Sequence, residues 1–396
     1  MTRGVGRARS SPLPSPSYGV YVHFPWCTTR CPYCDFAVTT VRPVEGGRYA
    51  RAVLKEIGLR APGFGALRCA TLYVGGGTPS LWDPGDLARV IRAVRGLGLP
   101  PRAEVTLEAN PESADAQRAR AWREAGVTRV SIGVQSFDAA VLAKLGRRHG
   151  PDDAERAIRE VASVIPNVSV DLIYGARRSS AAVARSDAER LASLPVAHVS
   201  AYALTLDADV LAEDVPLARL ARSGRVAFPG DEEVLAQADA IGETLGRAGL
   251  RRYEISNFAR PGFESRHNLL YWRAGSYLGV GAGAVGCLRG DGRAMRWSNL
   301  RQVPAWFDAL DADRMPSAEE EHLSPRESRN ELIMLALRTA RGLDAALLSS
   351  DQLAEAQALS GAGLAALRHG RLSLTGRGMN VHSAVAERLF EPRERT

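Results

Sequence analysis

Short apolar runs alternate with helical patterns through the first half of the chain, and this alternation limits the fold more than any other feature. Each run is rich in Val, Ile, Tyr or Thr and ends near glycine, proline or polar residues, as strands do. The expected strands are residues 18–24, 70–74, 103–108, 127–133, 168–174 and 197–203. Between them, the apolar spacing of amphipathic helices recurs. The expected helices are residues 50–59, 84–96, 113–125, 151–163 and 180–193.

Repeated strand–helix units predict an α/β fold with a parallel sheet and right-handed crossovers. Six such units predict a partial (β/α)6 barrel of the TIM type, and a doubly wound sheet fits the same pattern. Residues 1–17 are basic and Ser/Pro-rich and are expected to be a disordered leader. The barrel is expected to span residues 18–245.

The second half of the chain is expected to be organised differently. Residues 246–315 contain many glycine and aromatic residues, and irregular structure is expected over most of this segment. Residues 316–396 read as a small C-terminal helical domain of winged-helix-like pattern, with a hairpin wing at 370–375. Its expected helices are residues 329–339, 351–359, 363–369 and 381–389.

Composition is that of an ordinary soluble globular protein of 396 residues, long enough to bury a large core without disulfides. The net charge of +7 favours either a solvated arginine-rich surface or binding to acidic partners. No dense basic stripe accompanies Arg368, His369 and Arg371 in the C-terminal segment, so no nucleic-acid partner is expected. No stretch approaches the roughly 18 apolar residues of a transmembrane helix, which leaves peripheral membrane contact open.

Three of the five cysteines, Cys27, Cys31 and Cys34, lie within eight residues. The other two, Cys69 and Cys287, stand alone and are expected to be buried, inert thiols. An odd cysteine count with one tight triplet makes a poor disulfide framework, so a cytoplasmic location is expected.

The cysteine triplet follows the first expected strand, at the end of the sheet where α/β proteins place their active sites. Three closely spaced thiolates suit an iron–sulfur cluster or a soft metal ion. A zinc site with His23 as the fourth ligand is the alternative, although structural zinc usually takes two pairs of ligands. Three thiolates on a four-iron (4Fe-4S) cluster would leave one iron open for a substrate or cofactor.

The spacing CxxxCxxC, with Tyr33 before the last cysteine, resembles the radical S-adenosylmethionine (SAM) superfamily. Further strings resemble one subgroup, which contains the oxygen-independent coproporphyrinogen III oxidases and the heme chaperones of the HemW type. The strings are GGGTPS at 75–80, EANP at 108–111, SIGVQSF at 131–137, LGRRH at 145–149 and DLIYG at 171–175. The resemblance covers roughly residues 18–390 and implies a 4Fe-4S cluster, SAM, an electron donor and reductive cleavage of SAM to a deoxyadenosyl radical.

The same strings suggest how SAM would be held. Glycine at the end of the second strand lets the backbone approach the amino group of SAM. Glu108 and Gln135 end neighbouring strands, so both face one rim, where they suit ribose hydroxyls and the amino-acid part. Arg147 can meet the SAM carboxylate, and Asp171 can accept from ribose or adenine. The residues expected to bind SAM are Tyr21, Tyr33, Gly76, Gly77, Thr78, Glu108, Gln135, Arg147 and Asp171.

A second motif separates the two branches of the subgroup. The segment His267-Asn-Leu-Leu-Tyr271-Trp272 resembles the HNxxYW signature of the heme chaperones. Histidine is a common axial ligand of heme iron, and the rings of Tyr271 and Trp272 can stack on a porphyrin. Arg266 and Arg273 are either partners for heme propionates or surface charges. For His267 taken alone, a hydrogen-bonded structural histidine is the alternative.

Three positions depart from the family pattern. Phe36 stands where the oxidase branch carries a fourth cysteine. Residues 176–180 read Ala-Arg-Arg-Ser-Ser instead of Leu-Pro-Gly-Gln-Thr, and Val285 replaces a histidine. The resemblance therefore favours a heme chaperone, which binds heme and transfers it to acceptor heme proteins such as respiratory-chain cytochromes. The alternative is an enzyme, the oxygen-independent coproporphyrinogen III oxidase, which produces protoporphyrinogen IX.

Overall fold

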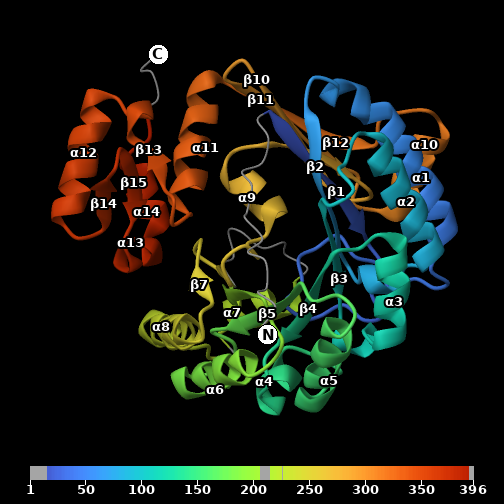
Figure 1. Ribbon diagram of the computed structural model, residues 1–396, viewed down its shortest axis with the longest axis horizontal. Helices are drawn as coiled ribbons and strands as arrows, with labels where there is room; N and C mark the ends of the chain where they lie inside the picture. Colours follow the sequence, from blue (N-terminus) through green and yellow to red (C-terminus); the bar gives the residue numbers. More distant parts are fainter. Residues whose placement is uncertain (1–15, 206–214, 225, 392–396) are drawn as a thin grey trace, which may run out of the picture.

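Six parallel strands in sequence order form the curved centre of the structure (Figure 1). The computed structural model describes residues 16–205, 215–224 and 226–391. The six strands are β1 (Ser17–Phe24), β2 (Arg68–Gly76), β3 (Glu104–Ala109), β4 (Arg129–Gln135), β5 (Val168–Tyr174) and β6 (His198–Ala203). Each strand pairs in parallel with the next, which confirms the predicted partial barrel. Most of the predicted leader lies outside the described residues, but Ser17 already belongs to β1.

Helices cover the outer face of this sheet (Figure 1). They are α1 (Gly46–Arg60), α2 (Pro84–Gly96), α3 (Ala116–Ala125), α4 (Ala139–Lys144), α5 (Pro151–Ala162) and α6 (Ala181–Ala192). The starts of α2, α3, α4 and α6 follow from local side chains, because Asp83, Asp115, Asp138 and Ser180 each accept a hydrogen bond from a backbone N–H of the first helical turn. The short helix α4 was not predicted, since its six residues are too few to show a period.

The strands carry apolar and polar side chains on opposite faces. On β3, Val105 and Leu107 are fully buried beneath the helices, whereas Thr106 and Glu108 face the interior of the curve. The same alternation on β4 buries Ile132 outward and turns Ser131 inward. Because successive side chains point to opposite faces, one strand contributes both to the core and to a polar interior.

The segment after residue 246 extends the same sheet, and the expectation of irregular structure there is wrong. Six strands are added: β7 (Arg251–Arg252), β8 (Asn257–Ala259), β9 (Ser276–Val280), β10 (Val285–Gly290), β11 (Arg293–Asn299) and β12 (Ser317–Leu323). β9 pairs in parallel with β1, and β8 pairs antiparallel with β6. The strand order therefore runs β12-β11-β10-β9-β1-β2-β3-β4-β5-β6-β8-β7.

Four more helices accompany these strands: α7 (Pro216–Arg222), α8 (Asp231–Arg247), α9 (Arg266–Trp272) and α10 (Val303–Asp311). Helix α9 carries the HNxxYW motif and lies on the concave side of the sheet (Figure 1). The carboxylate of Glu104, at the start of β3, accepts hydrogen bonds from the backbone N–H groups of Arg266 and His267, at 3.0 and 2.9 Å. This contact fixes the first turn of α9 inside the barrel.

The C-terminal module has a hydrophobic cluster of its own that includes Leu337, Leu372 and Leu389. Its elements are α11 (Pro325–Leu337), β13 (Leu343–Asp344), α12 (Ser350–Gly361), β14 (Ala365–Arg368), β15 (Arg371–Leu374), α13 (Gly376–Asn380) and α14 (His382–Glu387). The helix predicted at 363–369 is wrong, because these residues form a hairpin with β15. His369 and Gly370 both have positive φ, which makes a tight turn and not a helix.

Among the described residues, no helix is both long enough and apolar enough to cross a membrane.

Candidate functional site

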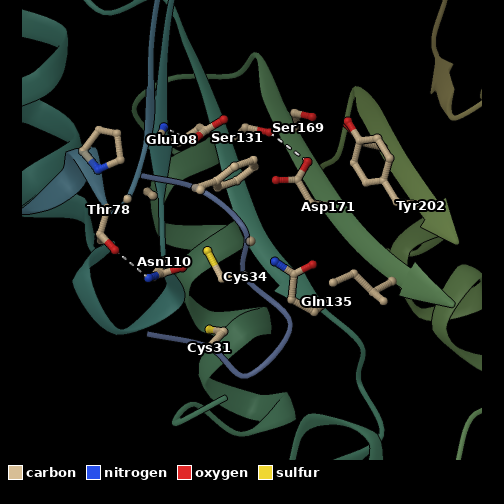
Figure 2. Close-up of a pocket in the computed structure, with 18 of the residues that line it drawn as sticks. Cys31, Cys34, Thr78, Glu108, Asn110, Ser131, Gln135, Ser169, Asp171 and Tyr202 are labelled. Atoms are coloured by element: carbon tan, nitrogen blue, oxygen red, sulfur yellow. Dashed lines mark hydrogen bonds between the residues drawn. The ribbon is translucent and has the colours of Figure 1, made fainter. Parts of the chain in front are cut away.

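A cavity of about 520 Å³ runs along the polar interior of the barrel (Figure 2). Its volume is in the range of small-molecule and cofactor sites. The cysteine triplet and eight of the nine predicted SAM residues line it together: Cys27, Cys31, Cys34, Tyr33, Gly76, Gly77, Thr78, Glu108, Gln135, Arg147 and Asp171. Figure 2 shows Glu108, Gln135 and Asp171 on strands that face the loop of Cys31 and Cys34. Tyr21 is not in this lining; its hydroxyl contacts the His23 ring at 3.0 Å.

The cysteines lie on a loop that follows β1 and is closed by backbone hydrogen bonds. The N–H of Cys27 donates to Thr39 O at 2.9 Å, and the N–H of Thr39 donates to Pro25 O at 2.8 Å. Burial raises the pKa of the Cys27 thiol, and it raises the pKa of Cys34 to about 11. A bound metal centre is therefore what would hold these sulfurs as thiolates.

His23 does not supply a fourth metal ligand, so the zinc alternative is not supported. Its Nε2 lies 2.8 Å from Ala37 O, and its Nδ1 lies 3.0 Å from the Tyr21 hydroxyl. Burial lowers the pKa of His23 to about 4, which keeps the ring neutral, with Nε2 donating to the carbonyl of the cysteine loop. No three His, Cys, Asp or Glu side chains of the described residues are spaced to hold one metal ion.

The glycines at the end of β2 are needed because the cysteine loop passes very close. Gly76 has φ of +115°, and a Cβ there would lie 2.7 Å from the His23 ring. A Cβ on Gly77 would lie 2.7 Å from Trp26 O, one residue before Cys27. Only glycine permits this approach, which brings the end of β2 against the cysteines.

Two carboxylates line the same cavity. Glu108 accepts from the Tyr73 hydroxyl at 2.7 Å and from the N–H of Gly76 at 3.0 Å. Asp171 accepts from the Ser131 hydroxyl at 3.1 Å. Burial raises the pKa of Glu108 to about 7 and that of Asp171 to about 6. Both groups can accept hydrogen bonds from hydroxyl or amino groups of a ligand.

Arg147 is held mainly by the protein. Its Nη2 donates to Asn110 Oδ1 at 2.6 Å and to Gly133 O at 2.8 Å, and its Nη1 donates to Cys31 Sγ at 3.6 Å. Its Nε is buried without a hydrogen-bond partner in the described structure. Contact with a SAM carboxylate, expected from the sequence, stays a prediction. Gln135 has φ of +72°, an unusual backbone for a non-glycine residue, at the end of β4.

Sequence reasoning missed most of the cavity lining. The missed residues include Tyr73, Thr106, Asn110, Arg129, Ser169, His198, Ser200 and Tyr202. Nearly all of them stand at alternate positions of otherwise apolar strands. That alternation is visible in the sequence, and it would have identified the strand face that lines a polar interior.

In the structure, His267 is a buried histidine with a hydrogen-bond partner at each ring nitrogen, as the structural alternative expects. The ring is 1% exposed; Nδ1 lies 2.8 Å from Thr71 Oγ1, and Nε2 lies 2.7 Å from the Tyr271 hydroxyl. Burial lowers the pKa of His267 to about 3, so the ring is neutral. In this conformation neither ring nitrogen is available to iron. Of the segment around the motif, Ser265 and Asn268 line the cavity, whereas Tyr271 and Trp272 do not.

The three departures from the family pattern lie at different distances from the cavity. Phe36 lines it and is 62% exposed. The altered loop at 176–180 does not line it; there, the Ser179 hydroxyl donates to Gln237 Oε1 at 2.9 Å, which ties the loop to α8. Val285 is partly exposed at the start of β10, outside the cavity lining. Cys69 and Cys287 are buried, as predicted.

The chain is similar to known proteins over nearly its whole length. The Radical SAM superfamily matches residues 21–180. A heme chaperone HemW of Mycobacterium tuberculosis is 38% identical over 385 residues, which cover 96% of each chain. The mouse protein named radical S-adenosyl methionine domain-containing protein 1, mitochondrial, is 36% identical and covers 86% of this chain and 77% of its own length.

Among solved structures, the coproporphyrinogen III oxidase HemN of Escherichia coli has the same fold. Its TM-score is 0.78 at 19% identity, with 96% of this chain and 92% of that chain covered. The radical SAM superfamily implies a 4Fe-4S cluster and SAM, and the three clustered thiols, the close-packed glycines and the carboxylates that line the cavity fit both groups. The motif HNxxYW is present at 267–272. The chain therefore belongs to the HemW family of heme chaperones within the radical SAM superfamily.

Proposed function

We propose that this protein binds heme and transfers it to an acceptor heme protein, on a scaffold that also binds a 4Fe-4S cluster and SAM. The observation that carries the proposal is that one helix, α9, bears the heme-chaperone signature and also helps to line the cavity with the cysteine triplet. Helix α9 supplies Asn268 to that cavity, and Ser265 at its N-cap lines it as well. Relatives from Mycobacterium tuberculosis and Escherichia coli, 38% and 34% identical to this chain, carry heme chaperone in their names.

The cluster and SAM are assigned to the residues at the carboxyl ends of the strands. Cys27, Cys31 and Cys34 would hold the cluster, which supplies an electron for cleaving SAM when reduced. Gly76 and Gly77 let the backbone approach the amino-acid part of SAM. Glu108 and Asp171, which already accept from Tyr73 and Ser131, would accept further hydrogen bonds from the amino and hydroxyl groups of SAM.

Heme is assigned to the face of the barrel that α9 occupies, with His267 as an axial ligand. Because the ring is buried and hydrogen-bonded at both nitrogens, α9 must move before Nε2 can reach iron. The hydroxyl of Tyr271 then competes with iron for the same nitrogen. The ring of Trp272, over which Arg338 lies at 4.4 Å, provides an aromatic surface beside it.

The heme assignment is tested by titrating heme into the purified protein and recording the Soret band. Tyr271→Phe removes the competitor and is expected to raise the heme affinity about two- to tenfold, the value of one neutral hydrogen bond. His267→Ala is expected to weaken binding and change the Soret band. Thr71→Val is the matched control, because it removes the contact at Nδ1 and leaves the contact at Nε2. An unchanged affinity and spectrum in both His267→Ala and Tyr271→Phe would remove His267 as the ligand.

Transfer itself is tested by mixing the heme-loaded protein with an apo-cytochrome of the b type and following the acceptor spectrum. The chaperone function predicts faster or more complete loading than free heme gives at equal concentration. The oxidase alternative is tested on the same preparation without oxygen, with a reconstituted cluster, SAM, a reductant and coproporphyrinogen III. Multiple turnovers to protoporphyrinogen IX would make the oxidase the primary function and reject the chaperone proposal.

The remaining partners are proposed on chemical grounds. Reduction of the cluster requires a one-electron donor. The five free cysteines of the described chain are consistent with action in the cytoplasm. Respiratory-chain cytochromes are the proposed acceptors of heme.

A further inference from the structure

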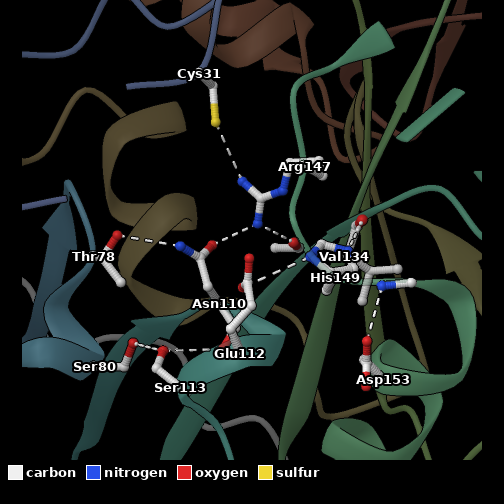
Figure 3. Close-up of polar contacts among 12 residues, drawn as sticks. Cys31, Thr78, Ser80, Asn110, Glu112, Ser113, Val134, Arg147, His149 and Asp153 are labelled. Carbon is white, nitrogen blue, oxygen red and sulfur yellow. Dashed lines mark hydrogen bonds and ion pairs between the residues drawn. The ribbon is translucent and has the colours of Figure 1, made fainter. Parts of the chain in front are cut away.

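The sulfurs of Cys27 and Cys31 are joined by a continuous chain of side-chain hydrogen bonds, of which Figure 3 shows the part from Cys31 to Thr78. Thr78 Oγ1 donates to Cys27 Sγ at 3.6 Å, and Asn110 Nδ2 donates to Thr78 Oγ1 at 3.2 Å. From the other side, Arg147 donates to Asn110 Oδ1 at 2.6 Å and to Cys31 Sγ at 3.6 Å. We call Thr78, Asn110 and Arg147 the sulfur bridge.

The direction of every hydrogen bond in the sulfur bridge is fixed by chemistry. A guanidinium has donors only, so the amide oxygen of Asn110 must face Arg147 and its NH₂ group must face Thr78. The Thr78 oxygen then accepts from Asn110, and its own hydrogen is left to point at Cys27. Both ends of the bridge therefore present hydrogen atoms to sulfur.

Contacts with the barrel hold Thr78 and Arg147, the two ends of the bridge. The N–H of Thr78 donates to Trp26 O at 2.8 Å, within the cysteine loop. Arg147 also donates to Gly133 O on β4, and His149, two residues on, lies 3.0 Å from Val134 O (Figure 3). Residues fixed in this way by the ends of neighbouring strands can control their sulfur partners without moving.

The third sulfur differs from the other two. The thiol of Cys34 interacts with the backbone amide of Phe36, a contact that no side-chain substitution removes. The hydrogen bonds from the bridge to Cys27 and Cys31 therefore depend on side chains, whereas that of Cys34 depends on the backbone of the loop.

We propose that the sulfur bridge sets the reduction potential of the cluster held by Cys27, Cys31 and Cys34. Added negative charge on a reduced cluster is stabilised by donors that point at its cysteine sulfurs, and Arg147 adds a full positive charge at one of them. Thr78, Asn110 and Arg147 are thus positioning residues for electron transfer. The proposal rests on the cluster that the family implies and is independent of heme transfer.

The test is an anaerobic redox titration of the full-length, reconstituted protein, followed by electron paramagnetic resonance, with neither heme nor SAM present. Thr78→Val removes the hydroxyl at nearly constant shape and is expected to lower the ratio of reduced to oxidised cluster at a fixed potential about two- to tenfold. Thr78→Ser keeps the hydroxyl and is expected to restore the wild-type ratio. Iron and sulfide content is measured on each variant, so that loss of cluster is distinguished from a change in potential.

A double-mutant cycle tests the direction of the chain. Asn110→Asp can only accept, so it turns the Thr78 hydroxyl away from Cys27 and is expected to reproduce the effect of Thr78→Val. Thr78→Val combined with Asn110→Asp should then give the same ratio as either single variant. If the two substitutions change the ratio of reduced to oxidised cluster additively, the negative charge introduced by Asn110→Asp acts independently of Thr78. The proposal is overturned if Thr78→Val and Asn110→Asp, both loaded with iron, retain the wild-type ratio, or if Thr78→Val and Thr78→Ser shift it equally. Because no heme is present, either failure leaves the heme proposal standing.

Discussion

A sequence motif identifies some side chains of the site, but these side chains are positioned by hydrogen bonds to residues outside the motif. Glu108 could be predicted from its place at the end of a strand, whereas its hydrogen-bond donor Tyr73 could not. Tyr73 lies opposite Thr106 in the parallel register of β2 and β3, and that pairing appears only once the strands are aligned. The cysteines were found because their ligand chemistry is encoded in local spacing. For His267 the sequence left two interpretations open, because its partner Thr71 is 196 residues away and no local pattern links the two.

The raised pKa of Glu108 predicts a pH-dependent stability. The folded group, with a pKa of about 7, binds a proton more tightly than the unfolded group does, for which the usual value is 4.5. Its contribution to stability is therefore fully present below pH 4.5 and is lost as the pH rises toward 7. We expect the unfolding free energy of the ligand-free wild type to fall relative to that of Glu108→Gln across this window. Urea unfolding of both proteins from pH 4 to pH 8 measures the difference, and parallel curves would contradict the prediction.

The helices and strands with a clear hydrophobic period and end signals in their own sequence were predicted. Strands that depend on pairing with a distant part of the chain were not. Strand β5 and helix α2 have the predicted bounds, because each combines a clear hydrophobic period with end signals in the sequence. Strand β9 was missed, because it is short, lies in a glycine-rich segment, and pairs with β1 more than 250 residues earlier. The hairpin of β14 and β15 was half predicted, since Leu364 to Leu367 read equally well as a helix.

Helix α9 depends on Glu104 for its first turn. Glu104→Ala leaves the N–H groups of Arg266 and His267 without their acceptor, and we expect a loss of about 1–3 kcal/mol in the free energy of unfolding. Hydrogen exchange should increase at residues 266–272 before it increases in β3. Glu124→Ala, at an exposed position on α3, is the control and should change neither quantity. Equal exchange in α9 of the wild type and Glu104→Ala would show that packing alone holds the helix.

Across the molecule, the barrel and the C-terminal module meet at a partly buried ion pair. Arg338 at the end of α11 donates to the fully buried Glu254 at 3.1 Å and lies over the ring of Trp272. The N–H of Ala340 donates to Tyr253 O at 2.9 Å beside it. The predicted helical character of the module is correct in its main helices, but its attachment could not be predicted, because the partners lie on separate elements.

Loss of Arg338 is expected to loosen this junction. Arg338→Met leaves the carboxylate of Glu254 buried with fewer partners, which should lower the unfolding free energy by about 3 kcal/mol. Glu254→Gln together with Arg338→Met removes the unpaired charge and should recover most of that loss. Urea unfolding of the two variants and the wild type measures both effects. A single Arg338→Met variant as stable as the wild type would show that the pair adds nothing to the junction.

Asn268 of α9 and the cluster cysteines line one continuous chamber. Helix α9 thus contributes part of the wall of the cavity in which SAM is proposed to bind. A movement of α9 that frees His267 for iron would therefore also change the wall of that cavity. Heme binding and SAM cleavage would then not take place in one molecule at the same time. The heme-loaded protein would leave SAM uncleaved until the heme had been released.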